Sequence, residues 1–235
     1  MCGRFVLNAS PEEIRELFGY TDETWFPARF NIAPTQPIGV VRQVAGMRHF
    51  SMMRWGLVPS WVKDPSSYQL LINARAESLY DRPAFRDAIL HRRCLVPASG
   101  FYEWKRGGKA SRPYWLPPTT GGVVAFAGIY ETWSDQDGRT IDSACIITVP
   151  ANRETAAIHD RMPAVVRPED YATWLTPGEL PPPVVESILR PPADNFFAPV
   201  PVGPRVNAAA NDGPDLIVEV PEPIPEEPAQ RSLFG

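Results

Sequence analysis

Short apolar segments alternate with polar and proline-rich ones along this chain, a pattern that predicts many short elements. The clearest helix begins after Ser10, takes Pro11 at its first position and ends at Gly19. Glu13 completes a capping box with Ser10. Shorter helices are predicted at Arg82–Arg92, Pro168–Leu175 and Pro183–Leu189.

Apolar runs with strand length and strand composition separate these helices. A mixture of short strands and short helices is typical of an α+β domain, here built on a curved and largely antiparallel sheet. The runs are Ile38–Arg42, Met47–Met53, Cys94–Ala98, Phe101–Lys105, Val123–Trp133, Ala144–Val149, Ala164–Arg167 and Leu216–Val220.

Proline content changes near the end of the chain and suggests a domain boundary. Residues 1–220 have the pattern of one folded domain. Residues 221–235 begin with the Pro- and Glu-rich run Pro-Glu-Pro-Ile-Pro-Glu-Glu-Pro, which predicts an extended, disordered tail.

The composition, with 44% hydrophobic and 21% charged residues, is that of a water-soluble globular protein. No apolar stretch approaches a membrane span and no signal-peptide pattern opens the chain, so we predict a cytoplasmic protein without membrane contact. Three cysteines far apart do not form a disulfide framework. His91 and Cys94 lie three positions apart without further ligands nearby, so no metal or other cofactor is expected.

The net charge of −4 conceals an asymmetry between the two halves of the chain. Residues 1–112 contain 16 Lys and Arg against 10 Asp and Glu, whereas residues 113–235 contain 7 against 17. Arginines interleaved with aromatic residues suit a nucleic-acid surface, where cations neutralise phosphates and rings stack on bases. The alternative is a set of scattered, solvated charges.

Cys2 follows Met1 directly and carries the most distinctive candidate chemistry. Removal of Met1 would leave a cysteine with a free α-amine beside its thiol, and both groups have nucleophilic forms near neutral pH. Such a 1,2-aminothiol reacts with an aldehyde through an imine and then closes a five-membered thiazolidine. The alternative is a small apolar residue at a frayed terminus.

Five short motifs in a fixed order give the chain its resemblance to a known family. Together with the Met1-Cys2 start they resemble the SOS-response-associated peptidase (SRAP) family of abasic-site-processing proteins. The resemblance extends to the segment Asn207–Pro214. The motifs are Cys2-Gly3-Arg4-Phe5, the turn-like Arg29-Phe30-Asn31-Ile32-Ala33-Pro34, Asn73-Ala74-Arg75-Ala76-Glu77, Gly100-Phe101-Tyr102-Glu103-Trp104 and His159-Asp160-Arg161-Met162-Pro163.

The resemblance implies a barrel-like antiparallel fold and capture of abasic sites in single-stranded DNA. We also predict that the protein is a monomer. In the family, the N-terminal cysteine condenses with the aldehyde of the opened abasic sugar into a thiazolidine DNA–protein cross-link during the DNA damage response. By the match of motifs Cys2 is the nucleophile. Associated lyase activity and a self-processing peptidase activity that exposes Cys2 are further implications.

The resemblance also assigns catalytic roles to three other residues. Glu103 matches the family's catalytic glutamate and would shuttle a proton to or from the sugar ring oxygen. The alternation of side chains along a strand places Glu103 on the same face as Phe101. The alternative to a catalytic role is that Glu103 faces solvent. His159 would transfer protons during imine formation and ring closure, or be structural. Asn73 would hold the cysteine amine or the opened sugar, or satisfy a loop backbone.

Three arginines, Arg4, Arg75 and Arg161, match the family's phosphate-binding positions, because guanidinium forks bind phosphate bidentately. Ion pairs within the protein are the alternative for each. Trp61 is a candidate to stack or wedge beside the lesion, with a core position as its alternative. The run Ala208–Ala210 departs from the larger polar or basic residues usual in the family, which weakens a DNA-binding role for that loop.

Two other functions are compatible with parts of this pattern. One is an N-terminal-nucleophile amidase or peptidase that uses the Cys2 amine as a base. The other is a non-catalytic reader of modified DNA. Cleavage of an amide without DNA would favour the first, and DNA binding that survives loss of Cys2 would favour the second.

The last residues resemble the short peptides with which bacterial DNA polymerases and repair proteins bind the sliding clamp. The chain ends in Gln230-Arg231-Ser232-Leu233-Phe234-Gly235. Gln230, Leu233 and Phe234 would be the contact residues, carried on an extended linker. The alternative is that Leu233 and Phe234 pack on the domain itself.

Overall fold

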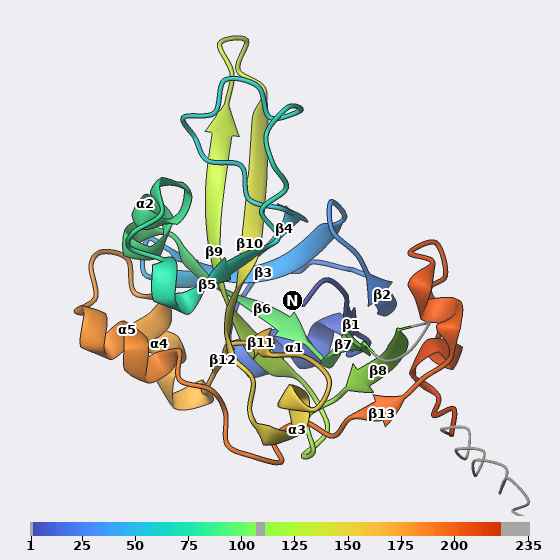
Figure 1. The fold of residues 1–235 in the computed structure, drawn as a ribbon. Coiled ribbons are helices and arrows are strands. Elements are labelled where there is room, and N and C mark those ends of the chain that lie inside the picture. The colour runs from blue at the N-terminus through green and yellow to red at the C-terminus, as the bar shows by residue number, and fades with distance from the viewer. Residues whose placement is uncertain (1, 107–110, 222–235) are drawn as a thin grey trace, which may run out of the picture.

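A ring of five strands closes into a β-barrel at the centre of the molecule (Figure 1). The computed structural model describes residues 2–106 and 111–221. Around the ring, one neighbouring pair is parallel and the others are antiparallel. The ring order is β10 (Thr140–Pro150), β4 (Met47–Trp55), β3 (Pro37–Val44), β6 (Arg93–Ala98) and β9 (Val124–Ser134), which pairs with β10 again.

Three short strands extend this sheet beside the ring. β5 (Asn73–Arg75) runs parallel to β10, whereas β11 (Arg161–Pro163) pairs antiparallel with β10 and β12 (Val165–Val166) with β9. The far part of the β9–β10 hairpin extends away from the body of the molecule (Figure 1). Motifs that lie far apart in the sequence therefore meet on the single long strand β10.

A second sheet of five strands covers one side of the barrel. Its inner face carries Phe5 and Phe101, whose rings lie 5.2 Å from Trp55 and 6.2 Å from Phe126, respectively. On the outer face Tyr102 joins a small cluster with the late part of the chain. The strand order is β13 (Val200–Pro201), β8 (Arg112–Leu116), β7 (Gly100–Lys105), β1 (Phe5–Leu7) and β2 (Arg29–Ile32).

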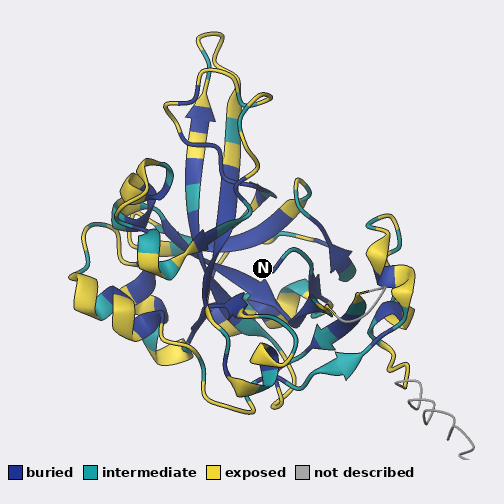
Figure 2. Ribbon diagram, viewed as in Figure 1, coloured by how far each residue is buried: buried dark blue, intermediate teal, exposed yellow. Residues whose placement is uncertain are grey.

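The helices are short and lie around the strands, and the buried residues concentrate in the strands between them (Figure 2). In α1 (Pro11–Phe18) the hydroxyl of Ser10 accepts a hydrogen bond from Glu13 N at 3.2 Å, and Gly19 ends the helix with φ 65°. The others are α2 (Pro83–His91), α3 (Arg153–Ala156), α4 (Tyr171–Leu175) and α5 (Pro182–Ile188), with 3₁₀ turns at Ala76–Ser78, Pro168–Asp170, Pro204–Asn207 and Pro214–Ile217. In the two described ranges, none of the helices combines the length and apolar character needed to cross a bilayer.

The predicted α+β class, with a barrel-like and mainly antiparallel sheet, is confirmed. Two local predictions are wrong. The segment Leu216–Val220 is not a strand: Pro214 starts a 3₁₀ turn, and Glu219 makes only an isolated bridge to Val202. The segment Arg29–Pro34 is not a turn, because its first four residues form β2 against β1. In both cases the tertiary partner decided the backbone conformation.

The end of the chain lies outside the described residues. Gln230, Leu233 and Phe234 belong to residues 222–235. The tail, its clamp-binding peptide and the domain boundary near residue 220 therefore stay predictions.

Candidate active site and nucleic-acid surface

Cys2 is fully buried at the start of the second sheet. Its thiol contacts the backbone carbonyl of Arg4, with Sγ 3.9 Å from the oxygen. Phe5 pairs with Phe101, and the continuation of this antiparallel register places Gly3 opposite Glu103. Glu103 is itself only 3% exposed. Burial, and after it the nearby Glu103 carboxylate, raises the pKa of the Cys2 thiol above its usual range.

A raised thiol pKa does not by itself distinguish Cys2. Cys94 and Cys145 are also fully buried, and burial raises the pKa of both thiols. Cys2 differs because it lies next to a buried carboxylate and close to the start of the chain. It therefore pairs a protonated thiol with a group that can accept the thiol proton.

His159 lies at the turn before β11, with its side chain 21% exposed. Its Nδ1 accepts a hydrogen bond from the backbone N–H of Arg161 at 3.0 Å, and a carboxylate oxygen of Asp160 lies 3.0 Å from the same atom. These two contacts to Nδ1 fix the orientation of the imidazole ring at the edge of β11.

A hollow of about 540 Å³ brings His159 together with the end of the strand that carries Glu103. It also includes Arg75, which is exposed on β5 and therefore available to a ligand. The lining residues are Arg75, Lys105, Arg106, Ala157, Ile158, His159, Asp160 and Arg161. With four cationic side chains against one carboxylate in its lining, the hollow is suited to an anionic ligand.

Lys105 and Arg106 also line this hollow, although the sequence motifs did not indicate them as candidates. Both are exposed at the end of β7, directly after the Glu103 motif. The signal was present, because the motif is followed by a short basic run. What the sequence lacked was the information that this strand end faces His159.

Asn73 lies two positions before Arg75 on β5, so the two side chains share a face of the strand. Its amide nitrogen donates to the carbonyls of Ile72 at 3.0 Å and Ile146 at 3.4 Å. Its buried Oδ1 accepts no hydrogen bond from any residue in the described ranges. An unsatisfied buried acceptor is costly, so this oxygen is prepared for a donor from a ligand or from the N-terminal amine.

Arg161 is 9% exposed and already has strong partners in the protein. Its guanidinium makes a bidentate pair with Glu77, with N–O distances of 2.7 and 2.9 Å, and also donates to the carbonyl of Thr148. The arginine hydrogen bonds lower the pKa of Glu77. The geometry therefore favours the ion-pair alternative for this residue.

Arg4 is also engaged by the protein. Its guanidinium donates to Asn31 Oδ1 and to the carbonyl of Val206, both at 2.8 Å, and to the carbonyl of Asn207 at 3.2 Å. Burial lowers its pKa, although arginine remains charged at neutral pH. These partners tie the start of the chain to its late segment.

Trp61 does not line the hollow that contains His159. Trp61 is 58% exposed, and its ring packs edge-on against Tyr68, with 5.7 Å between the ring centroids. In the same loop, the carbonyl of Val62 accepts a hydrogen bond from Trp133 Nε1. Trp133 pairs with Ile141 of β10, whereas Asn73 pairs with Ile146, five residues further along β10. Five residues of β-strand span about 17 Å. Trp61 therefore offers an exposed ring beside a part of β10 that lies some distance from Asn73.

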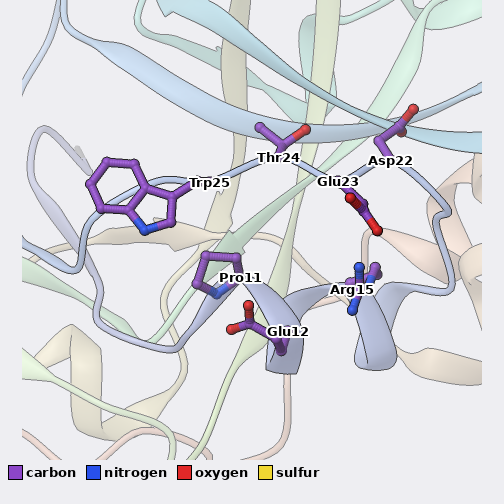
Figure 3. A pocket seen from close by; sticks show the side chains of 7 residues that line it. All are labelled: Pro11, Glu12, Arg15, Asp22, Glu23, Thr24 and Trp25. Atoms are coloured by element: carbon purple, nitrogen blue, oxygen red, sulfur yellow. The ribbon is translucent and has the colours of Figure 1, made fainter.

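A second hollow, of about 460 Å³, lies between α1 and the following loop (Figure 3). It contains none of the predicted site residues. Three of its side chains are carboxylates, which disfavours a phosphate backbone there. The lining residues are Pro11, Glu12, Arg15, Asp22, Glu23, Thr24 and Trp25. In the described part of the chain, this hollow included, no three His, Cys, Asp or Glu side chains gather in a way that could hold a metal ion.

Comparison with known proteins gives consistent matches over most of the chain. The abasic site processing protein YoqW of Bacillus subtilis is 35% identical over 221 residues, which cover 92% of this chain and 99% of that protein. The abasic site processing protein HMCES of Gallus gallus is 32% identical over 199 residues, covering 74% of this chain and 59% of that protein. A solved structure from Bacteroides thetaiotaomicron shares the fold, with a TM-score of 0.83, 22% identity, and coverage of 93% of this chain and 100% of that one.

The family profile described as SOS response associated peptidase (SRAP) matches residues 1–209. This range includes the motifs that begin at Cys2, Asn73, Gly100 and His159. The chain therefore belongs to the SOS response associated peptidase (SRAP) family.

Proposed function

We propose that this protein processes abasic sites in single-stranded DNA and captures them covalently through Cys2. The observation that carries the proposal is the buried Cys2 thiol next to Glu103. Glu103 lies on β7, and the end of this strand reaches the basic hollow that contains His159. The names of the relatives in Bacillus subtilis and Gallus gallus, both abasic site processing proteins, support the same substrate.

The reaction needs a free amine, so it begins after Met1 has been removed. The Cys2 amine attacks the C1′ aldehyde of the opened sugar, and loss of water gives an imine. The Cys2 sulfur then adds to the imine carbon, while the thiol proton reaches the imine nitrogen. The product is a thiazolidine, and water is the by-product. Sulfur addition removes the electron sink that would otherwise promote β-elimination, so a lyase reaction competes until the ring closes.

Side chains around Cys2 supply the proton transfers in this proposal. Glu103 lies close enough to raise the pKa of the thiol, and it accepts the thiol proton as sulfur adds. His159, which lines the basic hollow, donates a proton to the departing oxygen. The unsatisfied Oδ1 of Asn73 accepts from the amine or from a hydroxyl of the opened sugar.

The DNA backbone is assigned to the exposed cations of the hollow. Arg75, Lys105 and Arg106 are free to approach phosphates. Arg161 contributes positive charge but remains bound to Glu77. Trp61 is proposed to stack on a base some distance from the lesion, which a flexible single strand can reach.

Incubation with single-stranded abasic DNA, followed by a denaturing gel, tests the proposal. The matured protein is expected to form a band that survives heat and detergent, and undamaged DNA of the same sequence is expected to give none. Amide cleavage without DNA would instead favour an N-terminal-nucleophile hydrolase. Binding without any covalent product would favour a reader of modified DNA.

Replacement of Arg75 by alanine is expected to weaken binding to single-stranded DNA and to flatten its salt dependence. One lost phosphate contact lowers the slope of log K against log salt concentration by about 0.7 for a single strand. Titrations at four salt concentrations measure this slope. Arg205→Ala is the matched control, because this exposed arginine pairs with Asp215 and does not line the hollow. An unchanged slope in Arg75→Ala would show that Arg75 does not contact phosphate.

A peptide of residues 226–235 is expected to bind a bacterial sliding clamp weakly through Gln230, Leu233 and Phe234. Burial of Leu233 and Phe234 would contribute roughly 1.5–3 kcal/mol each. Fluorescence anisotropy with the labelled peptide measures the affinity, and a peptide with both residues changed to alanine is the control. The full-length double variant should still cross-link naked abasic DNA. If neither the peptide nor the full-length protein binds the clamp at high micromolar concentrations, this proposal is contradicted.

A further inference from the structure

The carboxamide of Asn31 forms a buried junction between the start and the end of the domain. Asn31 is fully buried on β2. Its Nδ2 lies within hydrogen-bond distance of the carbonyls of Val206, Ala208 and Asn211, at 3.2, 3.1 and 2.8 Å. Its Oδ1 accepts from Arg4 at 2.8 Å. Both ends of one amide are therefore committed to segments almost the full domain apart in sequence.

The guanidinium of Arg4 completes this junction. Two of its three hydrogen bonds go to the same late segment, to the carbonyls of Val206 and Asn207. It also lies over the Trp104 ring at 5.9 Å, and Trp104 Nε1 donates to Asn207 Oδ1 at 2.8 Å. Charge-assisted bonds in a fixed fork hold a backbone more firmly than single neutral bonds do. The side chain of Arg4 is thus fixed from three directions.

The backbone of Arg4 contacts the reaction site directly. Its carbonyl accepts from Tyr102 N at 2.9 Å and lies 3.9 Å from Cys2 Sγ. This single residue therefore anchors the N-terminal segment beside the strand that carries Glu103. Any displacement of Arg4 moves the Cys2 thiol relative to the Glu103 carboxylate.

We propose that Asn31 is a positioning residue, and that its bonds to Arg4 and to residues 206–211 hold Cys2 in register with Glu103. The inference deepens the proposed function and rests on it. It gives Arg4 a positioning role in place of a phosphate contact. It also gives the late segment a task that needs no DNA contact, consistent with the small residues Ala208–Ala210.

The chemistry of position 31 makes the idea testable with small changes. Asn31→Asp keeps the acceptor for Arg4 but replaces the donor by an oxygen that faces three carbonyls, which is unfavourable when buried. Arg4→Lys keeps the positive charge but loses the planar fork. Loss of a phosphate contact would lower the affinity for DNA, whereas loss of a fixed junction lowers the cross-linking rate at saturating DNA.

The experiment compares matured wild type, Asn31→Asp, Arg4→Lys and the double variant. Rates of cross-linking are measured at saturating single-stranded abasic DNA. Affinity and salt slope are measured with a tetrahydrofuran abasic analogue, which has no aldehyde. Each single variant is expected to lower the saturating rate about tenfold or more, a typical result of lost orientation, while affinity for the analogue changes less than twofold. The double variant should be no slower than the slower single variant.

Controls separate this inference from the proposed function. Arg205→Met removes an arginine of the late segment that is 69% exposed and pairs with Asp215, and it should change no rate. Thermal unfolding of the four proteins supplies a second readout without DNA. The losses of stability caused by Asn31→Asp and Arg4→Lys should be non-additive in the double variant. Arg4→Lys with a normal rate, or additive effects in both readouts, would overturn the inference. Absence of cross-linking by wild type would instead remove the proposed function.

Discussion

Cys2→Ala is expected to abolish the heat-stable cross-link to abasic single-stranded DNA. Without sulfur the amine can still form an imine, but no ring closes and the imine hydrolyses or undergoes β-elimination. Cys2→Ser should also lose the stable product, because an oxazolidine opens more readily than a thiazolidine. The measurement is the fraction of labelled DNA that is shifted on a denaturing gel after heating in detergent.

The structure offers a matched control for this loss. Cys94 and Cys145 are as buried as Cys2, and burial raises the pKa of their thiols too. Cys94→Ala should therefore cross-link like wild type. A chain that retains Met1 has no free Cys2 amine and should give no stable product. A full yield from that chain would contradict the mechanism, even if Cys2→Ala is inactive.

Glu103→Gln and His159→Ala are expected to slow cross-linking strongly while DNA affinity stays nearly intact. Positioned acid–base groups typically contribute about 10²–10⁴-fold. Glutamine preserves the size of Glu103 but cannot accept the thiol proton, and alanine removes the imidazole of His159. Rate constants at saturating DNA, together with affinity for a non-reactive abasic analogue, separate the two effects.

Suitable controls lie outside the hollow. His91 has its side chain 47% exposed on α2, and His91→Ala should leave the rate unchanged. Glu131→Gln weakens a pair with Arg92 away from the hollow and should affect stability rather than chemistry. Weakened DNA binding combined with a normal saturated rate in Glu103→Gln or His159→Ala would show that the assigned roles are wrong.

Local sequence signals predicted the elements whose partners are close in the chain. Ser10, Glu13 and Gly19 defined α1, because a helix cap needs only residues within one turn. The long apolar runs predicted β3, β4, β6, β9 and β10, because strands buried on a closed barrel must be apolar. Among the strands of two to five residues, the run Ala164–Arg167 predicted β12, whereas others such as β1 and β8 were missed, since so few residues show no period.

The sequence by itself determined the candidate chemistry: a cysteine that follows Met1, a glutamate among aromatic residues, and a histidine followed by Asp160 and Arg161. Residue types and their order are local properties, so they are readable without a fold. Only the tertiary structure decided which charges remain available. Arg75 and Arg161 look equivalent in sequence, yet Arg75 is exposed at the hollow while Arg161 is buried against Glu77. The register of β5 and β11 on the shared strand β10 produces this difference, and no local pattern encodes a pairing between strands so far apart.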